Sequence, residues 1–188
     1  MAKKKNGRGP LRLLGRIISS SLFLLIILVA TWLIITFIGQ KTIVSGSSME
    51  NTLSDGDQII VDKISYRFDR PNRYDIVVFP YPHNKSKLYI KRIIGMPGET
   101  VQIGNDGIVL INGEPLNESY GREVIASAGI AEYPVTLSDD EYFVLGDNRN
   151  DSQDSRDSMV GNIKKEEFVG KAWARIWPLD RMGKLRHQ

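Results

Sequence analysis

The most constraining feature of this chain is an uncharged segment of 22 residues, Ile17 to Ile38, rich in leucine and isoleucine. As a helix it would be roughly 33 Å long, enough to cross a hydrocarbon core of about 30 Å. A cleavable signal peptide would have a shorter apolar core that ends in a small-x-small site, and Phe37 to Lys41 offers no such site. The segment therefore predicts a retained transmembrane helix over residues 17–38.

Charge divides the chain at this segment. Residues 1–16 carry six lysines and arginines and no acid, and the positive-inside rule predicts that this basic tail is cytoplasmic. Residues 41–188 are then extracytoplasmic, in a cell-membrane protein with a single span. Without the six tail residues, 19 basic residues face 22 acidic ones. The body of the protein is therefore not expected to bind nucleic acid.

Beyond residue 41 the pattern is that of short β-strands separated by turn residues. The expected strands, rich in β-branched and aromatic residues, are 58–63, 74–79, 88–94, 100–103, 108–111, 141–145 and 168–177. Residues 113–140 are polar without a period and are interpreted as a small variable insertion, and residues 181–188 as a polar tail that packs against nothing. The sequence predicts a mostly β fold, with an antiparallel β-sheet domain over residues 41–188.

A stretch of small and hydroxylic residues, Ser45 to Ser48, follows the apolar segment closely, and Met49 and Leu53 add apolar anchors. By composition it fits a flexible linker as well as a turn that carries a nucleophile. A serine nucleophile needs a base. The chain has only two histidines, His83 between prolines and His187 next to the end, so a Ser-His-Asp triad is not expected.

Lys91 is the alternative base, because it lies inside the apolar run 88–94. Burial of an ammonium group is costly and lowers its pKa, and a neutral amine can take a proton from a serine hydroxyl. The competing interpretation is an edge-strand lysine whose amine reaches water.

The polar turn 146–156 holds three acids and two arginines. A calcium loop would need a ligand where Arg149 stands and a glycine where Ser152 stands, so no metal is expected there. The turn is interpreted instead as one held by internal hydrogen bonds and ion pairs, which can aim the Ser152 hydroxyl at a neighbour.

Together these stretches resemble the bacterial type I signal peptidases, membrane-anchored serine proteases with a Ser/Lys dyad, and in particular the Gram-positive members. Residues 47–53 are similar to the serine box of that family, residues 73–79 to a structural strand, and residues 89–99 to the lysine box. Residues 146–156 match the box G-D-N-R-x-x-S-x-D-S-R at every specified position.

The resemblance implies Ser48 as the nucleophile and Lys91 as its general base. It also implies that Ser152 hydrogen-bonds the Lys91 amine, while Asp154 and Arg156 shape the site. The resemblance places four residues around the pockets for small substrate side chains: Val44, Met49, Leu53 and Ile90.

Two positions depart from the family pattern. Asn51 stands where the serine box usually has a proline, which should loosen the turn slightly. Gly46 stands where some members carry a serine that helps bind the oxyanion. The oxyanion would then rely on backbone donors, chiefly the Ser48 N–H.

The expected function is that of a membrane-bound serine endopeptidase, which removes signal peptides from secretory preproteins with small-x-small cleavage sites and needs no cofactor. Two alternatives stay open. One is another Ser/Lys processing peptidase, and the other is a non-catalytic, membrane-tethered homologue that binds exported peptides.

Overall fold

The computed structural model describes residues 19–32 and 39–185. The chain divides into two units, Met1–Ile38 and Gly39–Gln188. In the first unit residues 19–32 form a helix whose side chains are exposed. Among the described residues no helix combines the length and the apolar character that a membrane crossing needs. The basic tail 1–16 and residues 17–18 and 33–38 of the expected span lie outside the described residues.

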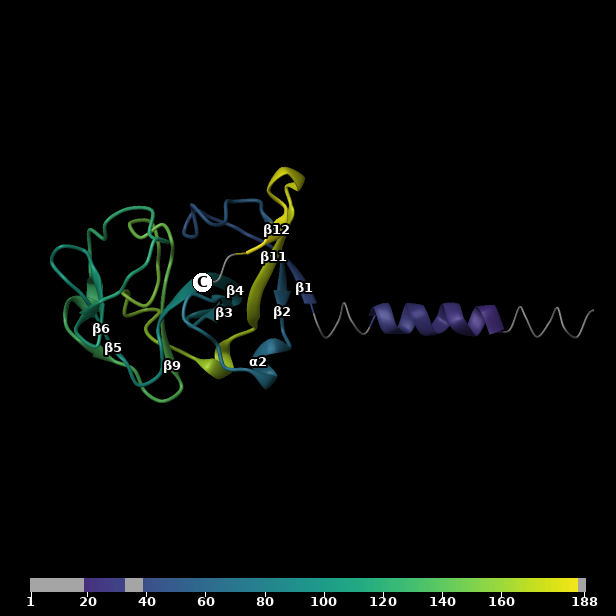
Figure 1. Cartoon of the computed structure of the whole chain (residues 1–188), viewed down its shortest axis with the longest axis horizontal. Coiled ribbons are helices and arrows are strands. Elements are labelled where there is room, and N and C mark those ends of the chain that lie inside the picture. Colours follow the sequence, from purple (N-terminus) through teal and green to yellow (C-terminus); the bar gives the residue numbers. More distant parts are fainter. Residues whose placement is uncertain (1–18, 33–38, 186–188) are drawn as a thin grey trace, which may run out of the picture. The chain divides into compact units, whose positions relative to one another are not determined.

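The second unit consists of two antiparallel sheets (Figure 1). The larger sheet has the strand order β1-β2-β11-β3-β4-β9-β10, with β12 paired to β11, and the smaller has the order β7-β6-β5-β8. The strands of the larger sheet are β1 (Gly39–Ile43), β2 (Gln58–Asp62), β3 (Ile76–Tyr81), β4 (Asn84–Gly95), β9 (Glu141–Leu145), β10 (Ile163–Lys164), β11 (Gly170–Trp177) and β12 (Gly183–Lys184).

Short elements complete this unit. The strands of the smaller sheet are β5 (Thr100–Ile103), β6 (Val109–Ile111), β7 (Glu114–Pro115) and β8 (Val135–Thr136). One α-helical turn, α2 (Ser65–Phe68), and three 3₁₀ turns, η1 (Gly129–Glu132), η2 (Lys165–Glu167) and η3 (Leu179–Arg181), connect the strands. The expected mostly β, antiparallel fold is thereby confirmed.

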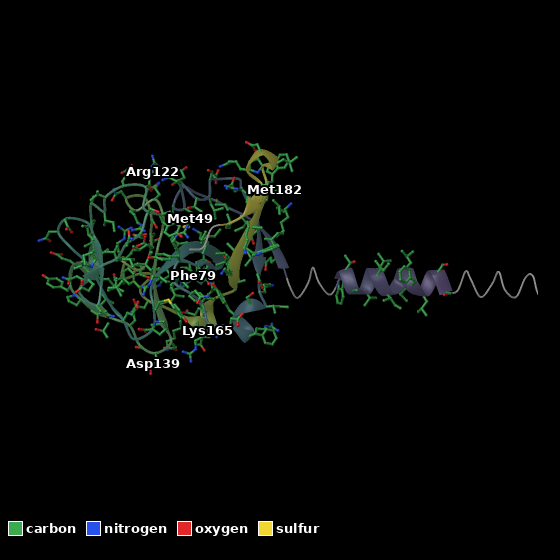
Figure 2. All side chains as sticks on the ribbon, viewed as in Figure 1. Met49, Phe79, Arg122, Asp139, Lys165 and Met182 are labelled. Carbon is green, nitrogen blue, oxygen red and sulfur yellow. The ribbon has the colours of Figure 1, made fainter. Side chains whose placement is uncertain are left out.

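The central strand β3 explains why the core lies on both faces of the larger sheet. Ile76 and Val78 point to one apolar cluster, whereas Val77 and Phe79 point to another, as the two-residue period of a strand requires. All four side chains are fully buried, and Phe79 lies in the interior in Figure 2. A continuous apolar run thus indicates a strand that is covered on both faces. Strand β4, which carries Lys91, pairs with β3 along this core.

Most strand predictions agree with the structure to within a few residues. The larger sheet also contains three strands that were not expected, β1, β10 and β12, and one strand, β4, that is longer than expected. Strand β1 was not expected, because its polar sequence has no strand signal of its own; it is held by antiparallel pairing with β2. Strand β4 begins at Asn84 rather than Leu88, because β3 and β4 form a hairpin in which Tyr81 pairs with Asn84.

Residues 113–140, expected to be irregular, form part of the smaller sheet and its core. They supply β7 and β8, and the side chains of Ile125, Ala131 and Leu137 are buried with those of β5 and β9. A few apolar residues at irregular spacing were enough to fill this core, which is why no period was visible. That the segment varies among relatives stays a prediction.

The expectation that residues 181–188 pack against nothing is wrong for residues 181–185. Strand β12 pairs with β11, and Leu185 is 4% exposed within a core cluster. The Arg181 guanidinium donates to Asp57 Oδ1 at 2.9 Å. Sequence reasoning missed the pairing of β12 because residues 183–184 are too short a run to show a strand pattern, and it missed the Arg181–Asp57 contact because the two residues are 124 positions apart. Residues 186–188, with His187, lie outside the described residues.

Candidate active site

The 45–53 turn is an ordered turn rather than a linker. Backbone hydrogen bonds close it, from Glu50 N to Ser47 O at 3.0 Å and from Leu53 N to Met49 O at 2.8 Å. The Met49 and Leu53 side chains are 1% and 0% exposed, so the turn is anchored in the core at two points four residues apart. This anchoring fixes the backbone that follows Ser48.

Lys91 lies in the middle of β4, opposite Val77 of β3, and is 4% exposed. Its amine donates to Ser48 Oγ at 2.6 Å and lies 5.2 Å from the centre of the Tyr89 ring. The side chain therefore does not reach bulk water, and the interpretation as a solvated edge lysine is wrong. The structure brings the two residues together from positions 43 apart in the sequence.

Burial lowers the pKa of the Lys91 amine from 10.5 to about 8. The carboxylates of Asp154, Asp147 and Asp151 act in the opposite direction, because negative charge stabilises the ammonium form, whereas the Arg156 guanidinium adds to the lowering. Desolvation is the largest of these effects, so a substantial fraction of the amine is neutral near physiological pH. The lowered pKa expected from the apolar strand is confirmed.

The 146–156 loop is held by a buried ion pair. Asp154 is fully buried, accepts from Arg156 Nε at 2.8 Å and Nη2 at 2.9 Å, and also accepts from Gly146 N at 3.1 Å. The Arg156 guanidinium then donates to the carbonyl oxygens of Arg149 and Ser127. Asp154 and Arg156 thus fix the shape of the loop, as the sequence predicted for a turn with internal ion pairs.

Ser152 differs from its expected role. Its Oγ is buried and makes no hydrogen bond to any of the described residues, so the expected hydrogen bond to the Lys91 amine is absent from this arrangement. The hydroxyl nevertheless lies at the site: a Cβ built on Gly146 would come within 2.2 Å of Ser152 Oγ and 2.5 Å of the Ser48 carbonyl oxygen. Only a glycine at position 146 leaves room for these two groups.

A second buried ion pair escaped the sequence analysis. Arg92 donates from Nε to Asp147 Oδ1 at 2.8 Å and from Nη2 to Oδ2 at 2.7 Å, and both side chains are 0% exposed. Thr52 Oγ1 also donates to Asp147, at 2.5 Å. This pair joins β4, the 146–156 loop and the 45–53 turn. Strand alternation places Arg92 on the face opposite Lys91. A second cation in that apolar run could have predicted a buried acidic partner.

A cleft of about 640 Å³ opens beside the Ser48–Lys91 pair. It runs between residues 42–49 and residues 86–91, and Val44, Met49 and Ile90 line it. Leu53, the fourth expected pocket residue, does not line the cleft, because it is fully buried in the cluster that also holds Met49. Among the described residues no group of three side chains is arranged to hold a metal ion.

The positions of Gly46 and of the free sheet edge complete the site. Gly46 has φ +96° and its N–H donates to Asp55 Oδ1 at 2.8 Å, so this backbone donor is already engaged. Strand β4 pairs with β9 only from Arg92 to Gly95, which leaves the edge formed by residues 84–90 open toward the cleft. An extended peptide can add to such an edge as a further strand.

A serine hydroxyl within hydrogen-bond distance of a buried, partly neutral amine, beside an open sheet edge, is the arrangement of a hydrolase that uses a Ser/Lys pair. Comparison with known proteins agrees with this class. A family model described as signal peptidase, peptidase S26, matches residues 17–177. The chain belongs to this signal peptidase family, and it is a serine signal peptidase.

Individual relatives carry the same description. Probable signal peptidase I-2 of Synechocystis sp. is 44% identical over 156 residues, which are 80% of this chain and 68% of that protein. Signal peptidase I of Leptolyngbya laminosa is 42% identical over 159 residues, 80% of this chain and 74% of that protein. A crystal structure of a signal peptidase I from Enterococcus faecalis, 35% identical, covers 55% of this chain and 97% of that one with a TM-score of 0.46.

Proposed function

We propose that this signal peptidase cleaves its substrates by acyl transfer, with Ser48 as the nucleophile and Lys91 as the general base. The observation that carries the proposal is the 2.6 Å hydrogen bond between Lys91 Nζ and Ser48 Oγ, made by an amine that burial keeps partly neutral at neutral pH. Proton transfer over this distance needs no rearrangement of either side chain.

The reaction has two halves. In the first, Lys91 takes the Ser48 proton, Ser48 Oγ attacks the scissile carbonyl carbon, and the Lys91 ammonium returns the proton to the leaving amine. In the second, Lys91 takes a proton from water, the hydroxide attacks the acyl-enzyme, and Ser48 Oγ leaves with the proton that Lys91 carried. The sequence of steps needs no metal or cofactor.

The tetrahedral oxyanion is bound by backbone N–H groups, chiefly that of Ser48, because the Gly46 N–H is engaged with Asp55. Ser152 supports the amine during the reaction, since its buried hydroxyl has no partner among the described residues and can still form a hydrogen bond. A hydrogen bond between this hydroxyl and the amine would be strongest when the amine is in its ammonium form.

The substrates are secretory preproteins whose signal regions end in a small-x-small sequence. The segment before the scissile bond binds in extended form along the open edge of β4 and places its small side chains against Val44, Met49 and Ile90, which line the cleft. Leu53 contributes indirectly, because it packs in the same cluster as Met49 and holds its side chain in place.

The protein acts at the outer face of the cell membrane. The apolar segment 17–38 anchors the chain once, with residues 1–16 in the cytoplasm, and Ser48 is only nine positions after Gly39. Several exposed apolar side chains near the end of the chain suit a surface close to lipid: Trp173, Trp177, Leu179 and Met182. Figure 2 shows Met182 in the segment that joins β11 to β12.

The test is cleavage of a preprotein by the detergent-solubilised protein, followed by the appearance of the mature band. A preprotein that ends its signal region in Ala-x-Ala is expected to be cut at that site. Replacement of the last alanine by a bulky residue is expected to lower kcat/KM at least about 100-fold, because the proposed binding mode places only small side chains against the cleft. Binding without cleavage would contradict the proposal, and so would equal cleavage of both substrates.

A further inference from the structure

The residue before Ser48 makes a contact that the reaction scheme does not use. The Ser47 hydroxyl donates to Asp151 Oδ2, in the 146–156 loop. Two hydrogen bonds from Asn148 accompany it: its side-chain Nδ2 donates to Ser47 O at 3.3 Å, and its backbone N donates to Ser48 O at 3.0 Å. The carbonyl oxygens of Ser47 and Ser48 thus both accept hydrogen bonds from the loop. Ser47 is also bonded to the loop through its side chain.

The backbone of the 45–53 turn needs a restraint near Ser48, and the Ser47–Asp151 hydrogen bond provides one. Gly46, at φ +96°, has the freedom that only glycine has, and Asn51 does not restrict the backbone as a proline would. Residues 45–47, which precede Ser48, are not buried in the core, so this side of the turn has little stiffness of its own. The hydrogen bond from the Ser47 side chain to Asp151, 104 residues away in the sequence, supplies this restraint.

Asp151 is itself held in place. Its backbone N–H donates to Asn148 O at 3.1 Å, so the carboxylate is presented from a closed turn. The residue lines the cleft that contains Ser48 and Lys91, and it also lines a second hollow together with Ser152. The tie between Ser47 and Asp151 therefore forms part of the wall of the reaction site.

We propose that Ser47 and Asp151 are positioning residues, whose hydrogen bond fixes the orientation of the Ser48 hydroxyl and backbone N–H toward the substrate carbonyl. The proposal rests on the proposed function of Ser48. Neither residue touches the reacting atoms: Ser47 acts through the peptide unit that it shares with Ser48, and Asp151 acts through Ser47.

The Asp151 charge has a second, separable effect on the amine. The groups that face Lys91 are the carboxylates of Asp147, Asp151 and Asp154, the Arg156 guanidinium, the Ser48 hydroxyl and, from its own strand, the Tyr89 ring; its neighbour on β3 is the apolar Val77. Because Asp151 stabilises the ammonium form, removal of its charge should lower the pKa of Lys91 and extend activity to lower pH.

The experiment is a double-mutant cycle on preprotein cleavage by the full chain. Ser47→Ala and Asp151→Ala are each expected to lower kcat about tenfold with KM changed by less than about twofold, because a hydrogen bond to a charged group is lost. The combined variant is expected to be about tenfold slower than the parent, not about 100-fold, because both single changes remove the same contact. Ser47→Thr keeps the hydroxyl and should retain most of the activity.

Asp151→Asn separates the two effects. It retains an acceptor for the Ser47 hydroxyl, so kcat at high pH should stay within about twofold of the parent, while the acidic limb of the pH profile moves down by about half a pH unit. Ser158→Ala and Asp139→Asn are the matched controls, since both residues are exposed. In Figure 2 Asp139 lies on the side of the unit opposite Arg122.

The outcomes are distinguishable. If the parent chain cleaves no preprotein, the proposed function and this inference are both wrong. The same holds if the Ser48→Ala variant cleaves as well as the parent. A cleaving parent whose Ser47→Ala variant works at the parent rate would overturn the inference alone. So would multiplicative losses in the combined variant, because two independent sites behave in that way.

Discussion

Replacement of Lys91 by methionine is expected to abolish preprotein cleavage, with kcat lowered at least about 10³-fold, because the thioether cannot accept the Ser48 proton. Ser48→Ala should have an effect of similar size, and the double variant should be no worse than either single one, because the two groups act as a unit. Quantitative cleavage of a preprotein measures all three. Lys184→Met, at an exposed position on β12, is the matched control and should keep the parent rate.

The same Lys91→Met variant should be more stable than the parent. The amine has a pKa of about 8 in the folded chain and 10.5 as a free side chain, so the unfolded state binds the proton more tightly. The folded parent is therefore destabilised by up to about 3 kcal/mol below pH 8, and this penalty falls as the pH rises from 8 to 10.5. Methionine fills a similar volume without a charge to bury.

Thermal unfolding of parent and variant across this pH range tests the argument. The difference in the free energy of unfolding should be largest at neutral pH and should shrink toward pH 10.5. If Lys91→Met unfolds at a lower temperature than the parent at pH 7, the buried ammonium group does not destabilise the folded parent, and this argument is wrong. Loss of activity in that variant would then be explained by loss of structure.

Arg92→Met is expected to have the largest effect on stability, a loss of about 3–5 kcal/mol in the free energy of unfolding. The variant leaves the Asp147 carboxylate, which is 0% exposed, without the two hydrogen bonds that neutralise it. Denaturant unfolding measures the loss, and cleavage should fall in parallel, because Asp147 also holds Thr52 of the 45–53 turn.

Two further variants show that the effect belongs to a buried charge. The double variant Arg92→Met, Asp147→Leu removes both charges. It should be more stable than Arg92→Met alone, because no unpaired buried charge remains. Arg122→Ala breaks the exposed pair with Glu50, in which both side chains are more than a third exposed, and should cost less than about 1 kcal/mol. Figure 2 shows Arg122 at the outer edge of the unit. Equal losses in Arg92→Met and Arg122→Ala would contradict the account.

The sequence predicted those parts of the site whose signal is local. Lys91 stands in an apolar strand, so its burial and lowered pKa follow from its neighbours alone, and the 146–156 turn contains both members of the Asp154–Arg156 pair. The resemblance to a family then pointed to Ser48 as the partner of Lys91. In these cases a residue and the cause of its special environment lie within a few positions of each other.

The parts that were missed depend on contacts between distant segments. Arg92 and Asp147 are 55 residues apart, and neither motif alone shows that they meet. Strands β1 and β12 form by pairing with β2 and β11. Their own sequences are short and polar and carry no strand signal. Residues 113–140 pack into the smaller sheet through a few apolar side chains. The Ser152 hydroxyl is buried near Gly146 and lacks the hydrogen bond that its motif implied.

The most direct test of the account is the pH dependence of kcat/KM for preprotein cleavage, which reports the pKa of the base in the free enzyme. We expect kcat/KM to fall tenfold per pH unit on the acidic side of a limb centred at about 8, where the buried Lys91 amine gains its proton. A limb centred near 10.5, the value of a solvated lysine, or a profile that stays flat between pH 6 and 9, would contradict the claim that a desolvated amine activates Ser48.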